Sequence, residues 1–319
     1  MLTPAYPHTT VLNTQLSEKC TLGCWALGGK GWGPQDPEVS IKTIKAAYES
    51  GITRFDTAQS YGNGYSEQLL GRALKNVRDR VFIASKAAFR PGEAMLKAVD
   101  ISLRRLNTDC IDLYYIHWPQ KGANLGECVD GLMRAREQGK IRHIGVSNFS
   151  VEQIREVMRA APIHAHQLCY NLLWRREERE VIPFCCKNEI KVITYSTIAQ
   201  GILSGKFKRD ISFPPGDHRK STLFFDPQVW PLVYETVNRF KTVSEQANRS
   251  LLELAIRWVC ENRVVSSVIV GARNVNQVRD LVNCFGQPVE RQVLEQLQRI
   301  SGELSAEMAD EGNIFRYYP

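Results

Sequence analysis

The chain has 319 residues, of which 43% are hydrophobic and 24% are charged, with a formal net charge of +7. This composition fits one large globular domain or two small ones. No apolar run approaches the roughly 20 residues of a membrane-spanning helix, and the opening MLTPAYPHTT lacks a secretory signal, so we expect a cytoplasmic protein with no membrane partner.

The positive charge and the cysteines narrow the function further. The basic clusters LWRREERE and KFKRD are mixed or short, which favours a solvated surface, and we expect no nucleic-acid partner. The nine cysteines include no CxxC motif, and the six histidines include no HExxH motif. We therefore expect free thiols in a reducing compartment and no metal site.

Short apolar or β-branched runs recur along the chain, and each comes before a stretch with helical periodicity. The first run, TLGCWALGG (21–29), is the weakest strand candidate. The later runs are TRFDTA (53–58), VFIASKA (81–87), CIDLYYIH (110–117), IRHIGVSN (141–148), AHQLCYN (165–171), KVITYST (191–197) and SSVIVGAR (266–273).

The stretches between these runs are typical of amphipathic helices, with apolar residues three or four positions apart. Helices are predicted over 37–51, 92–107, 151–162 and 274–285. Between 198 and 265 the spacing changes to a long loop and two helical stretches, 229–248 and 250–263, and a C-terminal helix is expected over 288–306. A long connection of this kind is usually functional.

Eight strand–helix alternations predict an α/β protein with a (β/α)8 TIM barrel. The strands carry hydrophobic residues at consecutive positions, as expected where both faces are buried. An open doubly wound sheet is the alternative, but no GxGxxG motif follows the first strand. Because no linker divides the sequence, we expect residues 1–319 to form a single domain.

Polar residues stand where these predicted strands end, and in a barrel those ends meet at one rim. Asp56 and Tyr61, Lys86, and His117 follow three successive strands. Taken singly, each has an ordinary structural explanation: a helix cap, a loop aromatic, a lysine reaching solvent or a satisfied histidine. Their joint occurrence at one rim favours a catalytic site.

The segments FDTAQSYGNGYSEQLLGRAL, IASKA, IDLYYIHWP, GKIRHIGVSNFS and YSTIAQGILSGK together resemble the aldo-keto reductases. The likeness runs in order over most of the chain. It is nearest to the bacterial and plant branch with the inositol-operon-type reductases, and potassium-channel β subunits are more distant relatives. The resemblance implies a (β/α)8 barrel that interconverts a small-molecule carbonyl and an alcohol with NADPH/NADP+, NADH being possible.

The resemblance also implies that the family's catalytic tetrad is Asp56, Tyr61, Lys86 and His117. A free tyrosine has a pKa of about 10, so we expect Lys86 to lower the pKa of Tyr61 for proton transfer. Asp56 would hold the Lys86 ammonium. His117 would orient the substrate oxygen as a neutral imidazole.

A cofactor site is implied by the same resemblance. Ser147, Asn148 and Gln167 would bind the nicotinamide carboxamide, Tyr195 would stack on its ring, and Arg273 would bind an adenosine 2′-phosphate. The remaining cofactor residues would be Gly23, Cys24, Trp25, Ser196, Gln200, Gly201, Leu203, Lys206, Arg219, Gly271, Gln277 and Asp280.

Two departures from the family pattern and a substrate pocket complete the predictions. Thr197 and Ile198 replace the usual Pro and Leu, which predicts a looser turn after Tyr195, and Leu281 replaces an adenine-binding Asn. The predicted substrate pocket contains Trp25, Trp32, Phe89 and Trp118, with Tyr65 as a further candidate.

Two other functions fit the same resemblance. One is an NADP(H)-binding regulatory subunit of a partner protein. The other is an NAD(P)-linked sugar or alcohol dehydrogenase that works in the oxidative direction. The sequence carries no signal for the oligomeric state.

Overall fold

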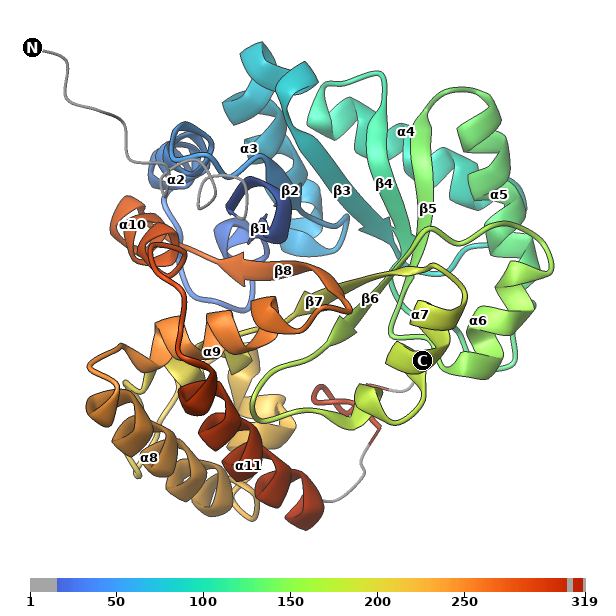
Figure 1. Ribbon diagram of the computed structural model, residues 1–319. Helices are drawn as coiled ribbons and strands as arrows, with labels where there is room; N and C mark the ends of the chain where they lie inside the picture. The colour runs from blue at the N-terminus through green and yellow to red at the C-terminus, as the bar shows by residue number, and fades with distance from the viewer. Residues whose placement is uncertain (1–15, 309–311, 318–319) are drawn as a thin grey trace, which may run out of the picture.

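Eight parallel strands close into a barrel in the computed structural model, which describes residues 16–308 and 312–317 (Figure 1). Neighbouring strands in the sequence pair in the sheet, and β1 pairs with β8 to close it. The strands are β1 (Cys20–Gly23), β2 (Arg54–Asp56), β3 (Phe82–Ala87), β4 (Ile111–Ile116), β5 (Ile141–Ser147), β6 (Ala165–Cys169), β7 (Lys191–Tyr195) and β8 (Val265–Gly271). The predicted (β/α)8 barrel is confirmed.

Helices surround this barrel, as their one-sided apolar periodicity predicts (Figure 1). They are α2 (Pro37–Glu49), α3 (Tyr65–Leu74), α4 (Gly92–Leu106), α5 (Leu125–Glu137), α6 (Val151–Met158), α7 (Val181–Lys187), α8 (Trp230–Gln246), α9 (Leu251–Glu261), α10 (Val275–Asn283) and α11 (Arg291–Glu307). α6 is shorter than the predicted 151–162, because Pro162 disfavours helical backbone in the residue before it.

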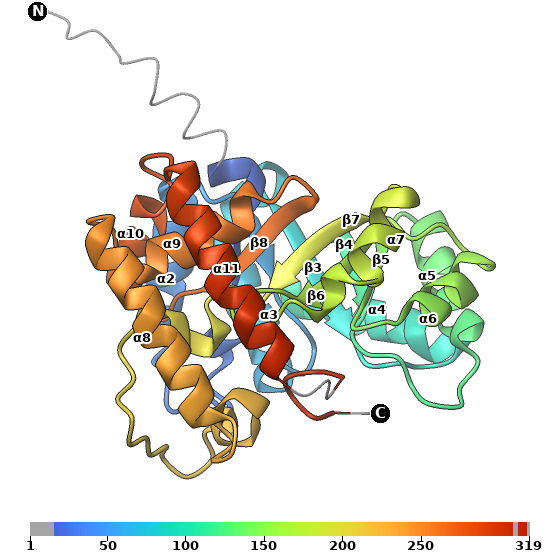
Figure 2. The ribbon, with the colours of Figure 1, turned by 60° about the horizontal axis from the view of Figure 1, so that its bottom comes forward.

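The long connection between β7 and β8 contains α8 and α9, as the break in spacing predicted. α8 and the C-terminal α11 lie side by side on the outside of the molecule in both views (Figures 1 and 2). The loop before α8 contains short 3-10 turns at Ala199–Ser204, His218–Ser221 and Leu223–Phe225. The connection therefore contributes both the outer helices and a loop at the strand ends.

Alternation along the strands divides the core into two parts. Leu113 and Tyr115 on β4 point into the barrel, while Tyr114 and Ile116 pack against the helices. Tyr115 lies opposite Gly145 on β5, where an added Cβ would come within 2.5 Å of the tyrosine ring. The tyrosine fills the barrel interior only because its neighbour has no side chain.

The first strand is shorter than predicted. β1 ends at Gly23, and Ala26–Gly28 form a 3-10 turn that ends at Gly29 with a φ of 77°. The predicted run 21–29 thus joins a strand to a turn that glycine permits. The short hairpin that the resemblance would place at the bottom of the barrel corresponds to PAYPHTTVLNTQ (4–15), and these residues lie outside the described part of the chain.

Among the described residues, no helix is both long and apolar enough to cross a membrane.

The strands of the barrel come from residues between Cys20 and Gly271, and α11 packs on α8. We propose on this basis that residues 1–319 form one domain.

Candidate active site

Strand alternation brings distant polar residues to one rim of the barrel. Lys86 lies two positions after Ala84, whose side chain faces the interior, so Lys86 also points inward at the end of β3. Asp56 ends β2 and pairs in register with Ala84. Gln167 points the same way from β6 as Ala165, another interior residue. The carboxyl ends of parallel strands thus present these groups to a common centre.

The centre of the site is a buried ion pair. The Nζ of Lys86 lies 2.5 Å from Oδ1 of Asp56 and donates a second bond of 2.7 Å to the carbonyl oxygen of Thr57. The Lys86 side chain has no exposed surface, and that of Asp56 is 4% exposed. The other Asp56 oxygen accepts a 2.8 Å bond from Nε2 of Gln167. Gln167, predicted to bind the cofactor carboxamide, therefore also fixes the carboxylate.

Electrostatics keep Lys86 protonated. Burial acts to lower the pKa of the lysine, but the negative charge of Asp56 outweighs it, and the pKa is raised. A carboxylate held by donors on both oxygens is a fixed counter-ion. The site therefore contains a permanent cation beneath its floor.

Tyr61 lies directly above this cation. Its hydroxyl is 3.4 Å from Nζ of Lys86, and its ring stacks on Trp25 with a centroid distance of 5.6 Å. The next residue, Gly62, has a φ of 59°, and an added Cβ there would lie 2.5 Å from the carbonyl oxygen of Gly28. Close backbone packing between these two glycines holds the tyrosine loop against the loop after β1.

The predicted lowering of the Tyr61 pKa is wrong in its net direction. Burial raises the pKa of this phenol, and although the Lys86 charge lowers it, the net pKa lies above the usual value. The sequence showed the lysine but not the extent of burial. Tyr61 is therefore a neutral phenol at physiological pH, which suits proton donation.

His117 completes the tetrad directly after β4. Its ring lies at 77° to the Tyr61 ring with a centroid distance of 5.8 Å, and its backbone N–H donates to Ala87. Burial, assisted by the Lys86 charge, lowers the pKa of His117 to about 3. The imidazole is therefore neutral near pH 7, as predicted.

A cavity of about 750 Å³ opens above the tetrad. Most of the predicted site residues line it: Gly23, Trp25, Trp32, Asp56, Tyr61, His117, Trp118, Ser147, Asn148, Gln167, Tyr195, Ser196, Gln200, Gly201, Lys206, Arg219, Gly271, Arg273, Gln277 and Asp280. Leu281, which stands where the resemblance predicts an Asn, lines it as well.

Five predicted residues lie outside this lining. Lys86 is buried beneath the floor, and Cys24 and Leu203 are fully buried in the core. Phe89 and Tyr65 pack against the core as partly buried side chains instead of facing the cavity. Phe89 and Tyr65 therefore lie apart from the cavity that the other predicted substrate-pocket residues line, because their aromatic rings pack against the core.

The predicted stacking residue is held by neighbours on two sides. The Tyr195 hydroxyl donates a 2.6 Å bond to Oδ1 of Asn148, whose Nδ2 donates to Ser147 and to the His117 carbonyl. The Tyr195 ring is nearly parallel to that of Phe315, with a centroid distance of 6.0 Å. These contacts fix the orientation of the Tyr195 ring in the cavity wall.

The turn after Tyr195 is tied down, contrary to the looser turn that was predicted. The Thr197 hydroxyl is buried and donates a 2.9 Å bond to the carbonyl of Ile269 on β8. Gln200 follows with a φ of 55°, and both polar atoms of its buried carboxamide lack a partner among the described residues. An unsatisfied buried amide costs about 1–3 kcal/mol, so this cavity wall fits a polar ligand such as a dinucleotide.

The long loop meets the β1 loop across the cavity. The centroid of the His218 ring lies 4.3 Å from that of Trp25 and 4.4 Å from that of Trp32. The His218 Nδ1 lies 2.5 Å from the Gly31 carbonyl oxygen. Arg219, predicted to bind the cofactor pyrophosphate, forms an ion pair with Asp217 at 2.6 Å. Its charge is thus already partly compensated by a neighbouring carboxylate.

Several residues of the site were missed in the sequence. His218, Phe315 and Tyr317 line the cavity, and Phe315 also contacts Trp25 and Trp118. His218 stands in the polar stretch GDHRK (216–220), but its position next to Trp25 is set by the path of the loop before α8. The aromatic pattern FRYY near the C-terminus was the available signal for Phe315.

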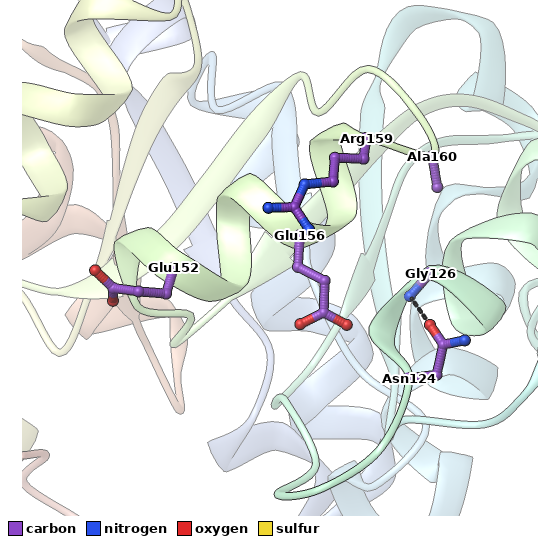
Figure 3. Close-up of a pocket in the computed structure, with 6 residues that line it drawn as sticks. All are labelled: Asn124, Gly126, Glu152, Glu156, Arg159 and Ala160. Atoms are coloured by element: carbon purple, nitrogen blue, oxygen red, sulfur yellow. Dashed lines mark hydrogen bonds between the residues drawn. The ribbon is translucent and has the colours of Figure 1, made fainter.

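Two other hollows are found among the described residues. One, of about 710 Å³, adjoins the main cavity at Trp118 and Tyr195. The other lies between α5 and α6, where Glu156 accepts a bond from the Leu125 N–H and Asn124 accepts one from Gly126 (Figure 3). These acceptors cap the free amides of the α5 N-terminus and have a structural use.

Comparison with known proteins gives consistent matches. Residues 19–301 match the model described as the Aldo/keto reductase family. The chain is 35% identical over 293 residues to the aldo-keto reductase YhdN of Bacillus subtilis (strain 168), covering 88% of each chain. It is 32% identical over 287 residues to the NADH-specific methylglyoxal reductase of Escherichia coli (strain K12), covering 82% of this chain and 87% of that one.

Solved structures agree with these matches. A glycerol dehydrogenase from Gluconobacter oxydans superposes with a TM-score of 0.81 at 32% identity, covering 91% of this chain and 93% of the other. An aldo/keto reductase from Klebsiella pneumoniae in complex with NADP and acetate superposes with a TM-score of 0.71 at 25% identity, covering 88% and 90%.

Proposed function

The chain belongs to the aldo/keto reductase family, and on that premise we propose that it reduces an aldehyde or ketone to an alcohol with NADPH. The observation that carries the proposal is the neutral Tyr61 phenol, 3.4 Å from a buried lysine cation on the floor of a large cavity. When bound, the nicotinamide supplies the hydride. The residues of this chain then align the carbonyl and deliver a proton to its oxygen.

Tyr61 is the proposed proton donor. Its raised pKa keeps the phenol protonated at neutral pH, ready to give a proton to an oxygen that becomes basic during reduction. The phenolate left behind would be stabilised by Lys86, held in place by Asp56. His117, as a neutral imidazole, can donate a ring N–H to the same oxygen and orient it.

The cofactor would extend from the tetrad to the part of the cavity that Arg273 lines. Tyr195 offers a ring face for the nicotinamide, Gln200 a carboxamide with no partner among the described residues, and Arg273 a cation for a 2′-phosphate. A similar protein is described as NADH-specific, and another was solved with NADP. Arg273 supports NADPH for this chain.

The substrate would be small or aromatic, because Trp25, Trp32, Trp118 and Phe315 line the cavity above the polar tetrad. The similarity to a glycerol dehydrogenase favours one alternative, the oxidation of an alcohol by the same residues. That direction requires Tyr61 to start as the phenolate that takes up the alcohol proton, and burial disfavours this charged form.

The test is a panel of carbonyls, including 4-nitrobenzaldehyde, assayed by loss of NADPH or NADH absorbance. Tyr61→Phe should lower turnover by about 10²–10⁴-fold while leaving NADPH binding within about twofold, because positioned proton transfer has that value. Tyr65→Phe, four residues along the chain, is the matched control and should keep wild-type turnover.

Three results would count against the proposal. Near-wild-type turnover in Tyr61→Phe would remove this residue from the mechanism. Tight NADPH binding without turnover of any carbonyl or alcohol would favour the regulatory-subunit alternative. Faster turnover of alcohols with NADP+ at neutral pH would favour the dehydrogenase.

A further inference from the structure

Arg273 is held by residues more than two hundred positions away in the sequence. Its Nε donates a 3.0 Å bond to Oε1 of Gln35, and its Nη2 donates a 2.9 Å bond to the Pro34 carbonyl. The Gln35 amide returns a 2.9 Å bond to the Arg273 carbonyl. One glutamine therefore binds both the side chain and the backbone of this arginine.

Gln35 is itself rigidly placed. It directly precedes Asp36, the N-cap of α2, whose carboxylate accepts a 2.9 Å bond from the Val39 N–H. Pro37 occupies the first helical position, where its fixed φ suits the helix start. The backbone that carries the Gln35 carboxamide is therefore fixed by a capped helix.

The bonds leave one side of the guanidinium available. Arg273 lines the cavity and Gln35 does not, so the glutamine contacts the arginine on the side away from the cavity. The Nη1 amino group of Arg273 has no partner among residues 16–308 and 312–317. The Arg273 backbone N–H donates to Gln277, which fixes the chain at the start of α10.

We propose that Gln35 is a positioning residue for cofactor selection: it holds the Arg273 guanidinium with its free amino group toward the cavity, where it binds the 2′-phosphate that distinguishes NADPH from NADH. This inference rests on the proposed function of the cavity. Arginine has a long, flexible side chain, and a phosphate contact gains affinity when the side chain is ordered before binding. Gln35 supplies that order without touching the cofactor.

The test measures binding rather than turnover. Quenching of tryptophan fluorescence by NADPH and by NADH gives two dissociation constants, since Trp25 and Trp32 line the cavity. Gln35→Ala should weaken NADPH binding by about three- to tenfold, the effect of freeing one long side chain, and leave NADH binding unchanged. Glu38→Ala is the matched control, because Glu38 lies on α2, which directly follows the segment with Gln35, and its ion pair among the described residues is with Arg72.

A double-mutant cycle separates positioning from a general structural effect. Arg273→Ala should abolish the preference for NADPH, and adding Gln35→Ala to it should change neither constant further. Equal weakening of NADPH and NADH in Gln35→Ala, with a lowered melting temperature, would overturn the proposal in favour of a merely structural role. Additive effects in the double variant would also overturn it.

Failure of the proposed function has a different signature. If the wild-type protein binds neither dinucleotide, the cavity is not a cofactor site at all. If it binds both equally and Arg273→Ala changes nothing, Arg273 does not read the phosphate. If the wild type prefers NADPH and Gln35→Ala keeps that preference, only the role of Gln35 is refuted.

Discussion

Replacing Lys86 by methionine tests the electrostatic core of the site. The Lys86 side chain is fully buried and its partner Asp56 is 4% exposed, so the change leaves an uncompensated buried carboxylate. Breaking a buried pair in this way costs about 3–5 kcal/mol of stability. Changing both partners, as in the Asp56→Asn, Lys86→Met double variant, removes both charges and should recover most of that loss.

The effect on catalysis follows from the 3.4 Å distance between Nζ of Lys86 and the Tyr61 hydroxyl. A full phenolate at that distance interacts with the cation by about 5 kcal/mol at an effective dielectric constant of about 20. If half of the charge has developed in the transition state, the loss is roughly 2–3 kcal/mol, or about 30- to 150-fold in rate. The double variant should be equally slow, because it also lacks the cation.

Urea unfolding and initial rates of carbonyl reduction at saturating cofactor give the two readouts. We expect Lys86→Met to have a lowered free energy of unfolding and the double variant to recover most of that loss. Both variants should have a low rate of carbonyl reduction. Turnover of Lys86→Met within threefold of wild type would refute the role of the cation. A double variant as unstable as the single one would refute the account of the buried carboxylate.

Three further outcomes follow from the same contacts. Because the pKa of Tyr61 is raised, the rate of carbonyl reduction should be constant with pH and fall only where the phenol ionises. The rate of alcohol oxidation should instead rise with pH. Parallel pH–rate profiles for the two directions would contradict this. Burial lowers the pKa of His166 to about 3, so stability is full above the unfolded pKa of about 6.5 and is lost as pH falls toward 3, by up to about 1.4 kcal/mol per pH unit. His166→Gln keeps an acceptor for the Phe149 N–H and should flatten that acid slope in urea titrations at pH 5, 6 and 7. Thr197→Val leaves the Ile269 carbonyl without its buried donor and should lower the free energy of unfolding by about 1–3 kcal/mol. Urea unfolding at pH 8 measures this change. An unchanged urea midpoint would show that the hydroxyl does not hold the turn.

The barrel and its rim were predictable because both depend on local patterns. Strand periodicity of two places residues of one parity on one face, so Asp56, Lys86 and Gln167 reach the interior once their strands are recognised. The alternation of strands and helices then permits few topologies. Proline at 162 and glycine at 29 changed element ends, which are the details that single residues decide.

What could not be predicted depends on burial and on long-range contacts. The pKa of Tyr61 is set by how much protein surrounds the phenol, and the sequence shows only the nearby charge. The contact of His218 with Trp25 joins residues that are far apart in the sequence, and the pairing of Arg219 with Asp217 depends on the local turn. The bonds between Gln35 and Arg273 likewise appear only when the first and last strands meet.

The contact between Gly28 and Gly62 has a practical consequence for altering substrate range by directed evolution. A Cβ at position 62 would overlap the backbone of Gly28, and a Cβ at position 28 would come within 3.1 Å of Gly62, so randomising either codon should yield mostly inactive clones. Gly33, in contrast, has open space around it although its φ is 79°. Mutant libraries are therefore best directed at positions 30 and 32, which line the cavity, with both contact glycines left unchanged.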